Sequence, residues 1–407
     1  MKIIKFGSKK LEKFYNRTFC RPKRLEDKVH KIIDDVRLFG DEALIKYTKK
    51  FDKVKLSHRQ LKVAAIEISA AYQNIDPRFV STLKVVIENI TRFYTKIKRK
   101  SWRTKDGESV VGENYSPLDK VGIYIPAGTA PLVSTVYMTV LPAKIAGVKK
   151  IILCSPPDKN GNINPHILAV ANLLKVDEIY RVGGAQAIAA MAYGTKTIPK
   201  VDKIVGPGNV YVSEAKRQVF GIVDIDMVAG PTELVIIANQ KSEPKFVIAD
   251  LKAQSEHAGG LAILITNSKA FANEIKSRVG DTNGLIVLTK NLQQAAEAVN
   301  RIAPEHLEIL INNPKRMAKQ IRHAGAIFLG PYSPTALGDY IAGPSHVLPT
   351  NGTARFFSGL SVLDFMKTNH IISYSKKALE KVKEPIEKIA AIEGLCKHLE
   401  SVKVRFE

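Results

Sequence analysis

Hydrophobic residues change their spacing along the chain, and each change marks a different kind of element. From residue 23 to about residue 94 they recur at three- and four-residue intervals, as at Val29, Ile32 and Val36. This spacing predicts amphipathic helices, and it continues over 63–72 and 77–96.

From residue 121 onward, short apolar runs bounded by Gly and Pro alternate with helical stretches. The runs lie at 121–126, 150–155, 178–182 and 203–205, and then at 234–238, 261–266, 285–288 and 326–330. Continuous apolar runs are typical of parallel strands that are buried on both faces. We therefore expect an α/β protein with two doubly wound, Rossmann-like parallel sheets, a helical N-terminal region and a helical C-terminal tail.

Composition narrows the class of protein. No apolar run approaches the roughly 20 residues that span a bilayer, and the basic N-terminus has no apolar stretch behind it, so we expect neither a membrane protein nor a secretory signal. The three cysteines, Cys20, Cys154 and Cys396, are far apart and form no CxxC pair. This usage favours a reducing compartment, and we expect a cytoplasmic protein.

The formal net charge of +23 raises the possibility of a nucleic-acid partner. The densest basic segment, 93–105, interleaves Phe93, Tyr94 and Trp102 with lysines and arginines, a pattern that base-stacking surfaces use. The alternative is a solvated basic face, because the remaining lysines are spread along the chain. We do not expect nucleic acid as a partner.

Three turns that contain glycine follow predicted strands, at 126–128, 183–186 and 206–209. Glycine lets backbone N–H groups approach a phosphate at the end of a sheet where ligands usually bind. Glycine also serves simply to turn the chain, and no GxGxxG is present to separate these two interpretations.

Two further segments carry candidate chemistry. Gln254 and His257 are three residues apart in a predicted helix that ends at Gly259 and Gly260, which would place both side chains on one face as metal ligands or as a solvated polar surface. Glu305 and His306 are adjacent beside Pro304, where they could act as a base and its helper or mark the end of a helix.

Six short runs, taken together and in this order, resemble the histidinol dehydrogenase family. They are IDMVAGPTE at 225–233, QSEH at 254–257, APEH at 303–306, GD at 338–339, HVLPT at 346–350 and EGLCKH at 393–398. The resemblance extends from about residue 20 to residue 400.

The resemblance implies a role for each of several residues. It implies one Zn²⁺ per subunit, held by Gln254, His257, Asp339 and His398, with His398 reaching across a homodimer from the tail of the other subunit. It implies a catalytic pair, Glu305 and His306. The metal ligands and His306 also contact substrate, together with Thr232, His346 and Glu393. Tyr124, Gln186 and Asn209 match positions that contact NAD.

The same resemblance, combined with the element pattern, suggests four parts. We expect an arm at 1–20, a first α/β domain from 21–120 and 233–360 with the zinc and catalytic residues, a second α/β domain at 121–232 that contacts NAD, and a helical tail at 361–407 that reaches the partner subunit.

The family reaction is the four-electron oxidation of L-histidinol to L-histidine through the aldehyde, with two NAD, in the last steps of histidine biosynthesis. It implies that His306, as a neutral imidazole near its unperturbed pKa, takes the proton when hydride leaves. It implies that Glu305 activates the water that hydrates the aldehyde, while zinc positions the substrate. A cysteine nucleophile is the rival for the aldehyde step, but no base accompanies Cys396 and Cys154 lies in an apolar strand, so we favour water.

Two segments depart from the family pattern: the turn reads PAG at 126–128, and the run before His346 reads GPS at 343–345. Neither removes a proposed ligand. Alternatives to this function are a related NAD- and zinc-dependent dehydrogenase acting on another amino alcohol or diol, a basic nucleic-acid-binding protein, and a relative without activity. Glu393 and His346 suit an amino-imidazole substrate and argue against the first alternative.

Overall fold

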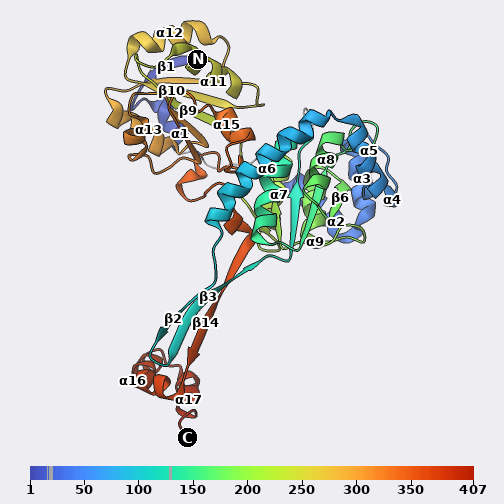
Figure 1. Ribbon diagram of the computed structural model, residues 1–407, viewed down its shortest axis with the longest axis vertical. Helices are drawn as coiled ribbons and strands as arrows, with labels where there is room; N and C mark the ends of the chain where they lie inside the picture. The colour runs from blue at the N-terminus through green and yellow to red at the C-terminus, as the bar shows by residue number, and fades with distance from the viewer. Residues whose placement is uncertain (16, 18–21, 128–130) are drawn as a thin grey trace. The chain divides into compact units, whose positions relative to one another are not determined.

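The computed structural model describes residues 1–15, 17, 22–127 and 131–407. Cys20 and the end of the 126–128 turn lie outside the described residues. The chain divides into two compact units, one formed by Met1–Ile97 and Leu118–Phe365 and the other by Lys98–Pro117 and Met366–Glu407. Two parallel sheets form the first unit, which confirms the expected α/β class (Figure 1).

The six-stranded sheet has the order β1-β11-β10-β9-β12-β13, and all its pairings are parallel. Its strands are β1 (Lys2–Lys5), β9 (Glu233–Ile237), β10 (Leu261–Thr266), β11 (Gly284–Leu288), β12 (His306–Ile309) and β13 (Ala326–Leu329). One face packs on α11 (Pro244–Gln254) and α12 (Lys269–Val279). The other face packs on α1 (Lys9–Tyr15), α13 (Leu292–Ile302) and α14 (Pro314–Ala318).

The expected N-terminal arm at 1–20 is corrected by this sheet. Residues 2–5 form an edge strand beside β11, and Leu11 of α1 is fully buried in the core of the sheet. The sequence KIIK is too short to show a strand period, and its burial comes from pairing with a strand that lies far away in the chain.

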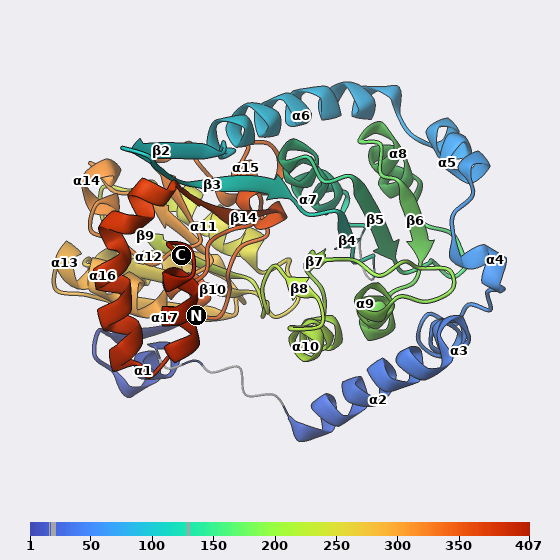
Figure 2. The ribbon, with the colours of Figure 1, turned by 90° about the horizontal axis from the view of Figure 1, so that it is seen from below.

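The five-stranded parallel sheet has the order β6-β5-β4-β7-β8. Its strands are β4 (Lys120–Tyr124), β5 (Lys150–Ser155), β6 (Glu178–Arg181), β7 (Lys203–Val205) and β8 (Asp224–Ile225). Helices α7 (Val133–Ala146) and α8 (Pro165–Leu173) lie on one side, and α9 (Gly184–Tyr193) and α10 (Val210–Val219) on the other (Figure 2).

The helices of residues 23–97 form outer layers on this second sheet (Figure 2). They are α2 (Lys23–Phe39), α3 (Asp41–Phe51), α4 (His58–Leu61), α5 (Ala65–Ala71) and α6 (Pro77–Ile97). Val29 and Leu44 share a core with Ile188 of α9, and α6 packs against α7. The expected grouping of 21–120 with 233–360 is therefore corrected, because the apolar stripes of α2 and α3 are buried against α9 and α10.

The second unit contains an antiparallel sheet of order β14-β3-β2 and two helices. The elements are β2 (Trp102–Asp106), β3 (Ser109–Pro117), β14 (Met366–Tyr374), α16 (Lys376–Ile392) and α17 (Cys396–Lys403). The expected all-helical tail is corrected at 366–374, which pairs residue by residue with β3. The basic segment 93–105 is split between the two units, with residues 93–97 in the first and 98–105 in the second. Tyr94 is buried in α6 and donates to the Leu360 carbonyl, so it cannot stack on a base.

Among the described helices, none combines the length and the apolar character that a bilayer crossing requires.

Candidate active site

The candidate catalytic residues lie where the strands of the six-stranded sheet begin. Glu233 opens β9 and His306 opens β12, and these neighbouring strands are parallel, with His306 aligned to Leu234. The segment 254–260 precedes β10, the strand on the other side of β9. The cluster therefore forms at the amino-terminal end of this sheet, opposite to the end that open α/β sheets generally use for ligands.

Glu305 and His306 are held by the start of β9. Glu305 Oε2 accepts hydrogen bonds from the Thr232 hydroxyl at 2.5 Å and from the Glu233 backbone N–H at 2.8 Å. His306 Nδ1 lies 3.3 Å from the Glu233 carbonyl oxygen and 3.6 Å from Glu305 Oε2. Both side chains are buried, and the two donors fix the position of the Glu305 side chain.

Asp339 and His346 approach His306 from the far side. Asp339 lies on the short helix α15 (Thr335–Tyr340), and its Oδ1 is 3.6 Å from His306 Nε2. His346 Nδ1 donates to the Asp339 carbonyl at 2.9 Å, which leaves Nε2 to accept from the Thr135 hydroxyl at 3.3 Å. The structure thus brings Glu305, His306, Asp339 and His346 together in one cluster.

The carboxylates control the proton of His306. Burial alone would lower the pKa of this imidazole, but the negative charges of Glu305 and Asp339 outweigh burial and raise the pKa to about 10. Burial likewise favours the neutral form of Asp339, yet His306, His346 and His257 hold its pKa below the usual value. The expected unperturbed pKa of His306 is therefore corrected, because two carboxylates face its ring. Burial also lowers the pKa of His346.

Gln254 and His257 do not share a helix. Helix α11 ends at Gln254, and His257 lies in the following turn, where its carbonyl accepts from the Gly260 N–H at 2.8 Å. This arrangement corrects the prediction that one helix carries both side chains. Gln254 is buried, and its amide nitrogen has no hydrogen-bond partner among the described residues, while His257 is exposed and close enough to Asp339 to affect its pKa.

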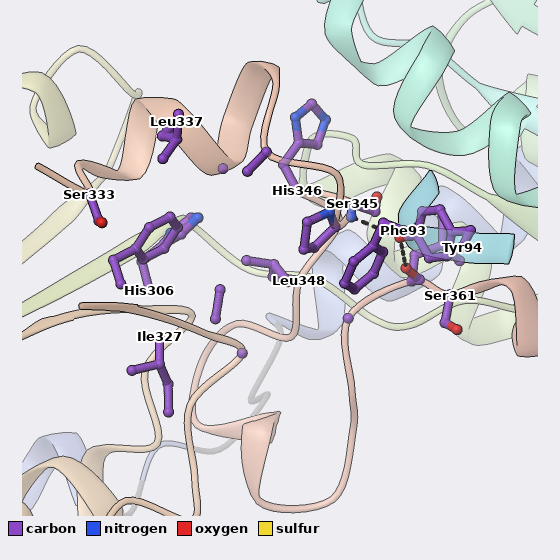
Figure 3. Close-up of a pocket in the computed structure, with 18 of the residues that line it drawn as sticks. Phe93, Tyr94, His306, Ile327, Ser333, Leu337, Ser345, His346, Leu348 and Ser361 are labelled. Atoms are coloured by element: carbon purple, nitrogen blue, oxygen red, sulfur yellow. Dashed lines mark hydrogen bonds between the residues drawn. The ribbon is translucent and has the colours of Figure 1, made fainter. Parts of the chain in front are cut away.

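A largely apolar cavity of about 540 Å³ opens on this cluster. His306 and His346 contribute two imidazole rings to its wall, and Phe93, Ile327 and Leu337 are among its apolar residues (Figure 3). Its size suits a small molecule, and few polar groups face it, so those present would fix the orientation of a ligand.

A second group of candidate residues lies in the five-stranded sheet. The strand order reverses between β4 and β7, and ligands of open α/β sheets bind outside the carboxyl ends of the strands at such a point. Tyr124 ends β4, and Gly206 follows β7 with φ +116°. A side chain at Gly206 would meet the Tyr124 carbonyl, so glycine is required there.

Gln186 and Asn209 begin the helices at this end of the sheet. The Tyr124 hydroxyl accepts from the Gly184 N–H at 3.1 Å, and Gln186 is buried with an amide oxygen that lacks a partner within the described part of the chain. The Asn209 side chain is exposed and caps α10 by accepting from the N–H groups of residues 211 and 212. The three residues matched to NAD contacts are thus all near the starts of α9 and α10.

Glu393 and His398 belong to the second unit. Glu393 follows α16, His398 lies in α17, and both side chains are exposed. The two described cysteines give no support to a thiol nucleophile: burial raises the pKa of Cys154 well above its usual value, and Cys396 is exposed on α17.

Sequence reasoning missed Glu233 and Arg17. The buried Glu233 carboxylate accepts the Asn351 N–H at 2.9 Å and forms an ion pair with Arg17, whose guanidinium also donates to the Ile302 carbonyl at 2.9 Å. The sequence signal for Glu233 was an acidic residue placed directly before an apolar run that predicts a buried strand. Arg17 lies outside every recognised run, and only the folded chain brings it to the site.

Within the described ranges, no three His, Cys, Asp or Glu side chains are arranged to hold a metal ion. The fold and the cluster define an α/β enzyme with a buried acid–base centre. A family model described as histidinol dehydrogenase matches residues 16–406.

Individual relatives agree with this match. The histidinol dehydrogenase of Listeria innocua is 48% identical, over 94% of this chain and 93% of the relative. That of Clostridium acetobutylicum is also 48% identical, over 100% and 99%. A crystal structure of histidinol dehydrogenase from Elizabethkingia anophelis has a TM-score of 0.94 and 36% identity, covering 100% of this chain and 98% of that one. The chain belongs to the histidinol dehydrogenase family and is an oxidoreductase.

Proposed function

We propose that this enzyme oxidises L-histidinol to L-histidine through the aldehyde, in a four-electron reaction that uses two NAD and one Zn²⁺ per subunit. The observation that carries the proposal is the buried cluster in which the His306 ring lies between the carboxylates of Glu305 and Asp339. A four-electron oxidation of an alcohol needs one group that exchanges protons with the substrate and another that activates water, and this cluster supplies both.

The proposed metal ligands fit zinc in their chemistry. Imidazole nitrogen and carboxylate oxygen are common zinc donors, and the amide oxygen of Gln254 would be an uncommon one. Gln254 is buried at the end of α11, one short turn before His257, and His257 lies close enough to Asp339 to lower its pKa. One chain would supply Gln254, His257 and Asp339. Only two of these are His or Asp, so this set does not form a cluster of three His, Cys, Asp or Glu side chains. The fourth ligand, His398, would come from the tail of the other subunit.

The chemistry then divides among the residues of this chain. When bound, zinc would hold the imidazole and amino nitrogens of the substrate, and NAD would accept hydride. With Nδ1 directed to the Glu233 carbonyl, His306 has Nε2 as the atom that exchanges a proton with the substrate hydroxyl. Once Asp339 serves as a ligand, its charge no longer favours the imidazolium, and the pKa of His306 falls toward the range that a base needs.

Glu305 is placed to activate water for hydration of the aldehyde. Both hydrogen bonds that Glu305 accepts from described residues fall on Oε2, from Thr232 and from the Glu233 N–H, so Oε1 is the atom left for a water. His346, Thr232 and Glu393 would contact the substrate, Glu393 by offering a carboxylate to its ammonium group. Tyr124, Gln186 and Asn209 would contact NAD.

The second subunit is part of this proposal. Helices α16 and α17 leave Ile389, Ile392 and Val404 between 54% and 87% exposed, an apolar surface that a second copy of the chain would cover in a homodimer. The cytoplasm is the compartment that we propose, because the three cysteines are far apart in the sequence and form no CxxC pair.

The test is NADH formation by purified protein with zinc, NAD and L-histidinol, beside simple alcohols and other amino alcohols. Two NADH for each histidinol consumed is the expected result. One NADH per histidinol would contradict the second step, the oxidation of the aldehyde. Turnover of another amino alcohol without turnover of histidinol would contradict the proposed substrate.

Asn209→Ala is expected to raise the KM for NAD by about tenfold, because a loop next to the nucleotide loses an amide that orders it. The same substitution removes the cap of α10 and lowers stability by about 0.5–2 kcal/mol. Asn291→Ala is the matched control, since Asn291 caps α13 in the other sheet by accepting from the Gln294 N–H at 2.9 Å. An equal KM for NAD in both variants would show that Asn209 only caps its helix.

A further inference from the structure

The proposed mechanism leaves one buried acid unused. Glu308 lies two residues after His306 in β12 and is completely buried. Leu307 and Ile309 face the core on the other side of the sheet, so His306 and Glu308 point to the same face, toward α11. A carboxyl group at such a position is costly unless it is satisfied by partners.

Glu308 contacts the two elements that carry proposed metal ligands. Its Oε1 accepts the backbone N–H of Thr335 at 2.8 Å, at the first residue of the helix α15 that carries Asp339. Its Oε2 has no hydrogen-bond partner among the described residues, and its second neighbour is the Asp250 carboxyl on α11, one helical turn before Gln254, which is close enough to raise its pKa.

The pair can hold these positions only if it carries a proton. Burial and the charge of Asp250 raise the pKa of Glu308 to about 9, and burial also raises the pKa of Asp250. At neutral pH the two carboxyl groups therefore share one proton, and a hydrogen bond replaces the repulsion between two charges.

Helix α15 depends on this contact because it is short. It has six residues, and a side chain at Gly338 would lie 2.6 Å from the Phe328 ring. The helix is thus fixed by the close approach of Gly338 to Phe328 and by the bond from its first N–H to Glu308. Phe328 is the ladder partner of Glu308 on the adjacent strand, so both fixed points lie at the same level of the sheet.

We propose that Glu308, paired with Asp250, is a positioning residue that holds α11 and α15 against β12, and so sets Gln254 and Asp339 in register to bind one metal ion beside His306. This inference rests on the proposed function, because it assumes that Gln254 and Asp339 are ligands. Residues that orient metal ligands typically change metal affinity by about 10–100-fold when they are replaced.

The experiment measures the zinc dissociation constant of the full-length protein by competition with a chromogenic chelator. Glu308→Leu is expected to weaken zinc binding by at least about tenfold, since it cannot accept from Thr335 or pair with Asp250. Glu308→Gln is expected to remain within about threefold of the wild type, because its amide oxygen can accept from Thr335 and its NH₂ group can donate to Asp250.

A second pair of variants keeps the test open if Glu308→Leu does not fold. Thr335→Pro removes the N–H that Glu308 accepts, at a first helical position where proline is tolerated. Thr335→Val loses the same hydroxyl but keeps the N–H. We expect weakened zinc binding in Thr335→Pro and near-normal binding in Thr335→Val, with Glu214→Gln as a control for a carboxyl group that is fully buried on helix α10, beside the other sheet.

The outcomes separate the two proposals. If the wild-type protein binds no zinc, the proposed metal site fails, and the positioning role fails with it. If the wild type binds zinc and folded Glu308→Leu or Thr335→Pro binds it equally well, the positioning role alone is overturned. Weakened binding in Glu308→Gln as well would contradict the role of the hydrogen bonds. Thermal unfolding of each variant confirms that it is folded.

Discussion

His306→Ala is expected to lower kcat for histidinol oxidation by about 10²–10⁴-fold, because the alcohol and then the hydrate lose the group that accepts their protons. The KM for NAD is expected to change little, since the nucleotide would bind at the other sheet. Steady-state NADH formation measures both constants.

His166→Ala is the control for the loss of a histidine. His166 packs edge-on against Phe79 at the start of α8, outside the cluster, and its replacement is expected to leave kcat near the wild-type value. Zinc content should stay unchanged in His306→Ala, since His306 is not a proposed ligand. A His306→Ala enzyme with full kcat would remove His306 from the chemistry.

Mixing two inactive variants is expected to restore about a quarter of the wild-type activity, if the tail of one subunit completes the site of the other. His306→Ala damages the site that holds residue 306, and His398→Ala damages the site that receives its tail. Random reassortment makes about half of the dimers mixed, and each mixed dimer has one of two sites with both residues intact.

The control mixes His306→Ala with Asp339→Ala. Both substitutions then lie in the first unit, so no combination of subunits has an intact site, and no activity should return. Should the first mixture also remain inactive after verified subunit exchange, His398 would act within its own subunit.

The parallel sheets could be predicted because their strands are continuous apolar runs between helices. The partner of each helix could not be predicted in the same way. The apolar stripe of α2 shows that one face is buried, but stripes of this kind fit any apolar surface, and only the fold places Val29 against α9.

The strand β14 escaped prediction for a different reason. Most of its residues are exposed, so Met366–Tyr374 shows no alternation of buried and exposed positions, and its pairing with β3 is made by backbone hydrogen bonds. A lysine-rich sequence beside it, in α16, has a clear helical pattern.

At the site, the residue types were predictable and the arrangement was not. The runs around Glu305, Asp339 and His346 named the groups, and the structure brings these groups together. The spacing of Gln254 and His257 suggested a helix because it matches the helical period, but the tight turn that ends at Gly260 begins directly after Gln254. The pKa of His306 is raised first by its neighbour Glu305 and then by Asp339, and the second of these is distant in sequence.

The cluster around His306 and the residues matched to NAD contacts lie at opposite ends of their sheets, and this placement has an electrostatic consequence. Helices α11 and α13 finish at the amino-terminal end of the six-stranded sheet, where their last carbonyl groups give partial negative charge that favours a cation. Helices α9 and α10 start at the carboxyl end of the five-stranded sheet, where free N–H groups give partial positive charge that favours a phosphate. If the proposed sites are right, two sheets of one plan are used at opposite ends and would offer the metal ion and the dinucleotide backbone dipoles of opposite sign.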